Sequence, residues 1–299
     1  MGAAPLPLRF GVSQFTTWPW SFEQDVENYS RLGVETIEVC EAKLADGDRL
    51  ADQLALVEQR GLEISSVQPS IRTLFPSRLQ PEPEGPRERT RLFRRTIDRF
   101  GRFARDVSFV CNTGQPPSGD IQRVLDAAAN EYRELADFAR EYGARIALEP
   151  LSPAHMNVET AIWTLGQAMK VVEEVDRVNF GVCVDTWNVW QNAEVFEEIK
   201  ACGERIFAVQ VSDWRTPRSF ADRHIVGQGE IPHSALLRAI YESGYRSAYT
   251  LEILSQGLPD ALWEANLFEV IESSRTGLKS AWDTAVASDQ LPGEKTPSD

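Results

Sequence analysis

The sequence predicts a (β/α)8 barrel, also called a TIM barrel, in an α/β chain with a single domain. Eight short apolar, β-branched segments recur along the 299 residues, and an amphipathic helix pattern follows each of them. Most of these segments are continuous in apolar residues, which is typical of parallel strands covered on both faces. A doubly wound open sheet is the alternative. Its dinucleotide-binding form is disfavoured because no G-x-G-x-x-G follows the first strand, so we expect no nucleotide cofactor.

The order of the elements follows directly from these patterns. We expect strands at residues 8–13, 35–40, 63–68, 107–111, 145–150, 179–185, 206–213 and 248–254. The first helix begins at a capping box formed by Ser21 and Gln24 and ends at Gly33. Further helices are expected at residues 47–60, 86–105, 119–142, 157–176, 191–203, 233–243 and 259–284.

No internal linker divides the chain, so the predicted barrel covers residues 1–285. Residues 286–299 are polar and are expected to form a flexible tail. A proline-rich insertion at residues 72–90 follows the third strand and could be a lid or a long loop.

The charge and the cysteines limit the classes of partner. The 31 basic and 45 acidic residues give a net charge of −14, which disfavours binding to nucleic acid. No apolar stretch approaches the roughly 18 to 20 residues that span a bilayer, so we expect no membrane partner. No signal peptide is recognised at the N-terminus. The cysteines form no C-x-x-C pair and are expected to be buried free thiols of a cytoplasmic protein: Cys40, Cys111, Cys183 and Cys202.

Polar side chains lie at the ends of the last four predicted strands. They are Glu149, Asp185, Gln210 and Glu252. In such a barrel the chemistry is found at the carboxyl ends of the strands. Several buried carboxylates at similar depth repel each other unless a cation lies between them. Oxygen ligands favour Mn²⁺ or Mg²⁺, with Co²⁺ as a further option, over zinc. The pattern therefore predicts a divalent metal site, with salt-bridged structural acids as the alternative.

Five segments together resemble the xylose-isomerase-like TIM-barrel superfamily, the sugar phosphate isomerase/epimerase group. The resemblance extends over most of the chain, and its order and spacing point to the superfamily rather than to one activity. The segments are ALEP (147–150), GVCVDTWN (181–188), VQVSDWRTP (209–217), DRHIVGQGEIP (222–232) and GYRSAYTLEILS (244–255).

The resemblance assigns the metal ligands position by position. Glu149, Asp185 and Glu252 match the carboxylates of the family. Many members have a histidine as fourth ligand, whereas this chain has Gln210, a neutral and weaker donor. The ketose 3-epimerases have a substrate-binding histidine at the position of Asn188, and asparagine cannot carry a proton. The chain has three histidines, too few for the three-zinc endonuclease branch.

The activity implied by the resemblance is a metal-dependent sugar isomerase or epimerase of carbohydrate metabolism. A proton would be abstracted next to a carbonyl of a sugar or keto-sugar through a metal-stabilised enediolate, with Glu149 and Glu252 as the acid/base pair. The first alternative is a lyase or dehydratase of a keto-sugar, similar to inosose dehydratase or to subunits that cleave 3-keto C-glycosides. The second is a metal-free binding subunit. The sequence leaves open whether the chain is a homo-oligomer or needs a partner subunit.

Several residues near the predicted mouth have a functional and a structural interpretation. His155 could be a general base or an exposed loop residue. Arg223 matches the substrate-binding arginine of the family, and His224 could line the same pocket. Asp213 could orient a metal ligand or Arg223. His233 is expected to be a surface residue at a helix start.

The remaining candidates would contact substrate. Glu38 matches the glutamate of the second strand in the family, and Asn188 could bind a hydroxyl group. Trp18, Trp20 and Trp187 could stack on a sugar or on an aromatic ring, although packing is the alternative for each of them.

Overall fold

The computed structural model describes residues 7–47, 49–216 and 222–287, and it contains a closed barrel of parallel strands. Each strand pairs with the next, and β8 pairs with β1, so that the sheet has no edge. The strands are β1 (Phe10–Ser13), β2 (Thr36–Cys40), β3 (Glu63–Gln68), β4 (Ser108–Cys111), β5 (Arg145–Leu148), β6 (Phe180–Asp185), β7 (Ile206–Val211) and β8 (Tyr249–Leu251). All eight predicted segments contain a strand, and the predicted TIM barrel is confirmed.

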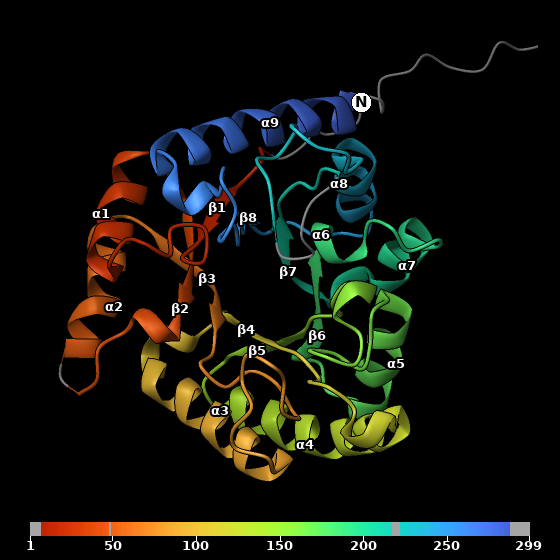
Figure 1. Cartoon of the computed structure of the whole chain (residues 1–299). Coiled ribbons are helices and arrows are strands. Elements are labelled where there is room, and N and C mark those ends of the chain that lie inside the picture. The colour runs from red at the N-terminus through yellow and green to blue at the C-terminus, as the bar shows by residue number, and fades with distance from the viewer. Residues whose placement is uncertain (1–6, 48, 217–221, 288–299) are drawn as a thin grey trace, which may run out of the picture.

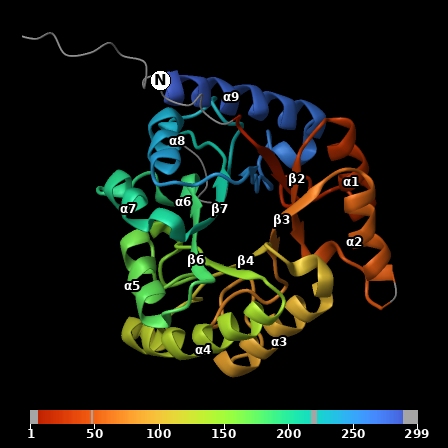
Figure 2. The same ribbon diagram turned by 180° about the vertical axis from the view of Figure 1, so that it is seen from behind.

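Helices surround the barrel, as Figures 1 and 2 show from its two ends. Helix α9 lies beside α1 and α8, which brings the last helix next to the first. The helices are α1 (Phe22–Arg31), α2 (Arg49–Gln59), α3 (Pro86–Phe100), α4 (Ile121–Glu141), α5 (Leu165–Val175), α6 (Thr186–Val189), α7 (Val195–Cys202), α8 (His233–Glu242) and α9 (Leu267–Ala287).

Two helix starts show what the sequence signals. The predicted capping box of Ser21 and Gln24 is present at the start of α1. The helix expected from residue 157 instead begins at Leu165, where Thr164 and Gln167 form a second capping box. The hydroxyl of Thr164 and the side chain of Gln167 satisfy the first free N–H groups of α5, so the helix begins there. The residues before it form the loop after β5.

The interior of the barrel changes from apolar to polar along its axis. Four small side chains from neighbouring strands form a cluster separate from the main core, and Phe207 packs against it; they are Val110, Ala147, Cys183 and Ala208. Since side chains alternate between the two faces of a strand, the residue that follows each of them along its strand points outward into the core beneath the helices. The next inward-facing layer, toward the strand ends, contains Glu38 and Gln210, which are polar and buried.

Other expectations can be compared with the described residues. All four cysteines are buried and unpaired, as predicted. Helix α9 continues to Ala287, past the predicted domain end at residue 285, and the predicted tail from residue 288 onward lies outside the described residues. Among the helices of the described residues, none combines the length and the apolar character that crossing a bilayer requires.

Candidate active site

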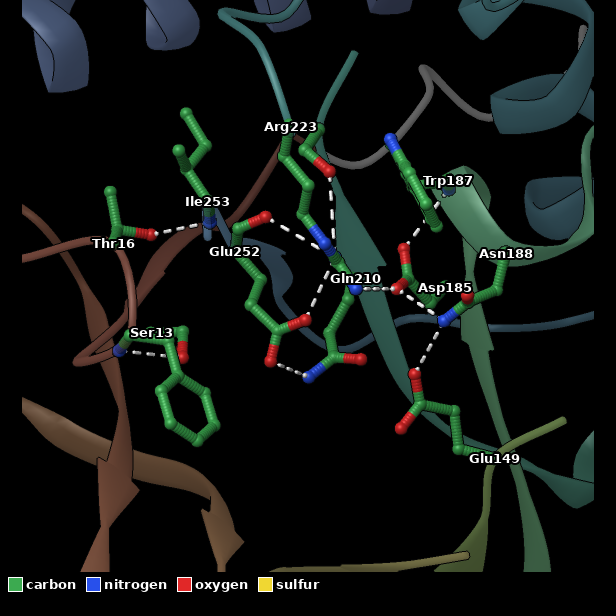
Figure 3. A network of polar contacts seen from close by, with 12 residues as sticks. Ser13, Thr16, Glu149, Asp185, Trp187, Asn188, Gln210, Arg223, Glu252 and Ile253 are labelled. Carbon is green, nitrogen blue, oxygen red and sulfur yellow. Dashed lines mark hydrogen bonds and ion pairs between the residues drawn. The ribbon is translucent and has the colours of Figure 1, made fainter. Parts of the chain in front are cut away.

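The four side chains predicted as metal ligands meet at the carboxyl end of the barrel (Figure 3). Glu149 directly follows β5, Asp185 is the last residue of β6, and Glu252 directly follows β8. Gln210 lies in β7, where its Cα is in register with that of Asp185. All four side chains are buried. The topology brings them together because parallel strands that end at one face of a barrel carry their last residues to one layer.

Arg223 lies at the centre of this layer, between two of the carboxylates (Figure 3). Its Nη2 is 2.7 Å from Oδ2 of Asp185, and its Nη1 is 2.8 Å from Oε2 of Glu252. The guanidinium is therefore paired with two acids at once, which is the bridging geometry that favours arginine over lysine. The sequence predicted Arg223 as a substrate-binding residue, and the structure adds that its positive charge already neutralises part of the acidic layer.

Two asparagines hold Glu149. Nδ2 of Asn188 donates to Oε1 of Glu149 at 2.9 Å and to Oδ2 of Asp185 at 2.8 Å. Nδ2 of Asn112 donates to Oε2 of Glu149 at 3.1 Å. Asp185 is also the N-cap of α6, where its Oδ1 accepts the N–H of Trp187 at 3.0 Å. The predicted candidate Asn188 thus lies within the acidic layer. Asn112 was not predicted, although a polar residue directly after β4 is the same kind of signal.

Gln210 presents its amide nitrogen, rather than its oxygen, to the acids. Its Nε2 donates to both oxygens of Glu38, at 3.0 and 3.1 Å, and to Oε1 of Glu252 at 2.9 Å. Its Oε1 accepts from the thiol of Cys183 at 3.3 Å. Ser66 donates a further hydrogen bond of 2.7 Å to Glu38. The predicted candidate Glu38 thus belongs to the layer, and Gln210 acts there as a donor.

Burial raises the pKa values of these carboxylates. The pKa of Glu149 rises to about 7, first because it is buried and second because the charge of Asp185 is near, while Arg223 acts in the opposite direction. Burial also raises the pKa of Glu252 well above its usual value, and Arg223 again opposes the shift. Arg223 pairs only with Asp185 and Glu252, so the four carboxyl groups of the layer, with Glu38 and Glu149 included, outnumber the one guanidinium that contacts them.

The donor chemistry of this layer fits a hard divalent cation. Three carboxylates and one amide provide only oxygen ligands, and the excess negative charge would be reduced by a dication. The present arrangement differs from a formed site. Within the described residues, no three His, Cys, Asp or Glu side chains are already spaced to hold a metal ion. A cation between Asp185 and Glu252 would take the place of the Arg223 guanidinium, and Gln210 would have to present its oxygen.

A cavity of about 120 Å³ opens above the layer. Glu149, Glu252 and Arg223 line it, together with the predicted residues His155 and Trp187. The centroids of the His155 and Trp187 rings are 5.9 Å apart, and the Arg223 guanidinium carbon is 5.2 Å from the centroid of the Trp187 ring. Burial, together with the charges of Arg223 and Arg78, lowers the pKa of His155 to about 4, so this imidazole is neutral at pH 7.

The first loop does not bring its tryptophans to the cavity. Trp18 is 40% exposed and stacks between Phe15 and Trp263, with centroid distances of 5.8 and 6.3 Å. Trp20 packs against Phe268 at 5.0 Å. Phe15 lines the cavity, whereas neither tryptophan does. Both tryptophans thus take the packing alternative, within the loop and against the C-terminal segment, and Phe15 is a cavity residue that sequence analysis did not predict.

Asp213 and His233 have other roles than predicted. The carboxylate of Asp213 accepts the backbone N–H groups of Gly227, Gly229 and Ile231 at 2.8 to 3.1 Å. It therefore orders the segment from Gly227 to Ile231, and among the described residues it contacts neither a predicted ligand nor the Arg223 side chain. His233 is buried, with its Nε2 at 3.6 Å from Oδ2 of Asp213, which corrects the expected surface position.

His224 lies just before the segment from Gly227 to Ile231 and does not line the cavity. It is buried, and its backbone exchanges hydrogen bonds of 2.7 and 2.8 Å with the backbone of Asp213. Its backbone pairing with Asp213 fixes the position from which the neighbouring Arg223 reaches the acidic layer.

The insertion after β3 lines the cavity, which the sequence left open. Arg72, Thr73 and Arg78 come from it, and Gln68 comes from the end of β3. Nε2 of Gln68 is 3.4 Å from Oε1 of Glu252. No local pattern predicted the two arginines, because the insertion reaches the cavity through pairing with the segment after β4.

Comparison with known proteins assigns the family. The family model of the xylose isomerase-like TIM barrel matches residues 26–274. The chain therefore belongs to this family, as the resemblance implied.

Individual relatives are more distant. The inosose isomerase of Bacillus subtilis (strain 168) is 30% identical over 137 residues, which are 44% of this chain and 48% of the relative. The 3-dehydroshikimate dehydratase of Pseudomonas putida (strain KT2440) is 28% identical over 192 residues, which are 60% of this chain and 28% of the relative. The aligned part thus spans about half, or less, of each curated relative.

Among solved structures, the IOLI protein with a bound zinc atom superposes with a TM-score of 0.77 at 21% identity. The match covers 93% of this chain and 99% of that one. At this identity the likeness concerns the fold.

Proposed function

We propose that the chain is an enzyme that moves a proton at a carbon next to a carbonyl group of a sugar or keto-sugar, as an isomerase or epimerase. One observation carries the proposal: Glu149 and Glu252, two buried carboxylates with raised pKa values, both line the same small cavity. A general base works best when its pKa is close to the working pH, and the pKa of about 7 at Glu149 meets this condition. The names of the relatives, an inosose isomerase and a 3-dehydroshikimate dehydratase, are compatible with this chemistry.

Glu149 is suited to take the proton. Asn112 and Asn188 each donate to a different oxygen of its carboxylate, so its orientation is fixed while it remains at the cavity wall. Fixed orientation shortens the search for a reactive geometry. Asn188 also donates to Asp185 and thereby links Glu149 to the next carboxylate of the layer.

Glu252 is suited to return the proton from another side of the substrate. It directly follows β8, across Arg223 from Asp185, and Gln210 and Arg223 hold its two oxygens. His155 is neutral and also lines the cavity, so it can accept or donate a hydrogen bond to a substrate hydroxyl. Arg223 and Trp187 form the adjacent wall, where a guanidinium beside an aromatic face suits a polyol ring.

The proposal includes a divalent cation held by Glu149, Asp185, Glu252 and the amide oxygen of Gln210. Such an ion, when bound, polarises a carbonyl group as a Lewis acid. We propose Mn²⁺ or Mg²⁺, with Co²⁺ as a further option, because every donor is an oxygen atom. If the cation bound Asp185 and Glu252, these carboxylates would no longer pair with Arg223, and its guanidinium would be available to substrate. The four unpaired buried thiols support a reducing compartment such as the cytoplasm.

A lyase or dehydratase of a keto-sugar is the second candidate. The alignment with a 3-dehydroshikimate dehydratase over 60% of this chain favours it, since elimination begins with the same abstraction of a proton next to a carbonyl. The neutral His155 at the cavity would then be placed to hydrogen-bond a leaving hydroxyl group. The metal-free binding subunit is the third candidate, and the experiment below separates all three.

The test is the incorporation of deuterium from D₂O into a panel of keto-sugars, followed by mass spectrometry, with bound metal measured by elemental analysis. We expect wash-in with the wild-type protein and a fall of about 10²- to 10⁴-fold in Glu149→Gln and Glu252→Gln, because each variant loses one proton-transfer group. Glu88→Gln, on the exposed side of α3, is the matched control and should retain the wild-type rate.

The products separate the candidates. An isomerase conserves the substrate mass apart from deuterium, whereas a lyase releases water or an aglycone. Wild-type exchange rates in both glutamine variants would contradict the assigned roles. A protein that shows neither exchange nor bound metal would be a binding subunit.

A further inference from the structure

The three arginines that line the cavity differ in how their charge is used. Arg223 is paired with two carboxylates of the acidic layer. Arg78 lies 3.5 Å from Glu159, whose carboxylate is buried at the same cavity. Arg72 has no carboxylate partner among the described residues, and its guanidinium carbon is instead 5.7 Å from the centroid of the Phe15 ring. One positive charge at the cavity wall is therefore not neutralised by a contacting acid.

Hydrogen bonds fix the backbone of Arg72 within the insertion. Its carbonyl oxygen accepts the N–H of Asn112 at 2.9 Å, and its own N–H is 3.3 Å from Oε1 of Gln80. The backbone of Arg72 is thus bonded to Asn112, whose side chain also donates to Glu149, and to Gln80 of its own loop. The guanidinium starts from a fixed point at the cavity.

The rest of the insertion is fastened to the barrel in the same way. Leu74 and Phe75 donate to the carbonyl oxygens of Asn112 and Thr113 at 3.0 and 2.9 Å. A Cβ at Gly114 would stand 2.0 Å from the carbonyl oxygen of Phe75, and its φ is +75°, so a side chain there would prevent the pairing. The buried Arg89 donates to the carbonyl oxygen of Thr73 at 2.6 Å. A wall that is this well supported is a built part of the cavity.

Arg72 faces the acidic layer across the cavity. It is half-buried, and its charge is near enough to Glu149 to lower the pKa of that carboxyl. No hydrogen bond joins the two among the interactions of the described residues, although both line the cavity. A molecule between them would therefore meet a base on one side and an unused guanidinium on the other.

We propose that Arg72 forms an anion subsite of this cavity, which binds the carboxylate or phosphate group of a ring-shaped polyol. A guanidinium offers a planar fork of N–H donors that matches both groups. With the anion at Arg72, the ring lies along Phe15 and its reacting carbon lies at Glu149 and Glu252. In this last respect the inference rests on the proposed function, and it narrows the substrate class to anionic sugars and cyclitols.

The test is equilibrium binding by calorimetry with three ring probes: quinate, which carries a carboxylate; myo-inositol, which is uncharged; and myo-inositol 1-phosphate. We expect the wild-type protein to bind at least one anionic probe about tenfold or more tightly than myo-inositol, since a charge-assisted hydrogen bond contributes more than one factor of ten. Arg72→Gln should abolish this preference, and Arg72→Lys should retain part of it. The stronger of the two anionic probes identifies a carboxylate or a phosphate as the group recognised.

Arg91→Gln is the matched control, because Arg91 is exposed on α3 and pairs with Glu88. It should keep the preference, and the melting temperatures of both glutamine variants should agree with that of the wild type. The proposal is overturned if Arg72→Gln keeps the preference, if myo-inositol binds as tightly as the anions, or if neither anion binds.

The same measurement in Glu149→Gln and Glu252→Gln separates this proposal from the proposed function. Both variants should keep the anion preference while they lose deuterium exchange. Anion preference without exchange in the wild-type protein would sink the proposed reaction and leave the subsite standing. Exchange without anion preference would sink the subsite alone.

Discussion

Two buried clusters of charge in this protein are built on different ratios of acid to base. In the first, behind β1 and β2, Asp25 accepts from Lys43 and Gln14, both at 2.7 Å, and from Thr17 at 2.6 Å. One carboxylate thus meets one ammonium group and two neutral donors. In the second, at the strand ends, Arg223 pairs with Asp185 and Glu252, whereas Glu38 and Glu149 accept hydrogen bonds from the neutral amides of Gln210 and Asn188.

The pKa values show the consequence. Burial raises the pKa of Asp25 to about 6, and the next largest influence, the charge of Lys43, lowers it. Burial raises the pKa of Glu149 to about 7, and the next largest influence, the charge of Asp185, raises it further. The first cluster is a balanced structural pair that fixes the first loop, since Lys43 also donates to the carbonyl oxygen of Thr17 at 2.8 Å. The second holds more carboxyl groups than basic partners, and raised pKa values of this kind are a property of a site that works on protons or cations.

The largest expected effect separates the clusters by stability. Lys43→Met leaves Asp25 as an uncompensated buried charge, and we expect a loss of about 3–5 kcal/mol in the free energy of unfolding. Arg223→Met should cost less at pH 7, because burial raises the pKa of Glu149 to about 7 and that of Glu252 well above its usual value, so protons are taken up more readily there than at Asp25, whose pKa is about 6. Urea denaturation of both variants in buffer with a chelator measures the difference. A larger loss for Arg223→Met would show that the second cluster is also a structural pair.

The parts of the fold and of the site that could be predicted from the sequence are those with a local pattern. The eight strands were predictable because each is a short apolar run, and Glu149, Asp185 and Glu252 were predictable because each ends such a run. The start of α5 was missed although the Thr164 capping box was available as a signal.

Other features depend on tertiary contacts that no local pattern encodes. Arg72 reaches the cavity only because the insertion pairs with the segment after β4, an approach that Gly114 permits. Asp213 ends β7 like a candidate ligand, yet its carboxylate binds the backbone of its own following loop. The orientation of the Gln210 amide is likewise set by two acids from other strands: Glu252 follows the neighbouring β8, and Glu38 lies on β2, three strands away around the barrel.

The dependence of stability on pH should extend to higher pH in the second cluster than in the first. A carboxyl group whose folded-state pKa lies above its unfolded value binds its proton more tightly in the folded state, so stability falls as the pH rises between the two values. For Asp25 this window runs from 3.8 to about 6, and for Glu149 from 4.5 to about 7. Each shift corresponds to a stability change on the order of 3 kcal/mol.

Denaturation between pH 4 and pH 8, without divalent cations, tests both windows. Asp25→Asn should remove the decline of stability between about pH 4 and 6, whereas Glu149→Gln should flatten the decline that continues to about pH 7. If the wild-type protein is equally stable at pH 5 and pH 7, neither carboxyl group has the raised pKa that the geometry gives it.

The smallest expected effect concerns what can replace the central guanidinium. Because Arg223 occupies the space between Asp185 and Glu252, it competes with any dication for the same oxygens. Arg223→Met should therefore bind Mn²⁺ more tightly than the wild-type protein does. A ligand at one hundred times its dissociation constant raises the free energy of unfolding by about 2.7 kcal/mol, so the gain is measurable by thermal or urea unfolding.

Lys43→Met is the matched control, because it also leaves a buried carboxylate without its basic partner. A single carboxylate with amide and hydroxyl neighbours cannot hold a dication firmly. Mn²⁺ should therefore stabilise this variant no more than the wild type. Equal gains in the two variants would contradict this expectation. The loss of a basic partner alone, and not the number of carboxylates in the strand-end cluster, would then explain the stronger binding of Mn²⁺.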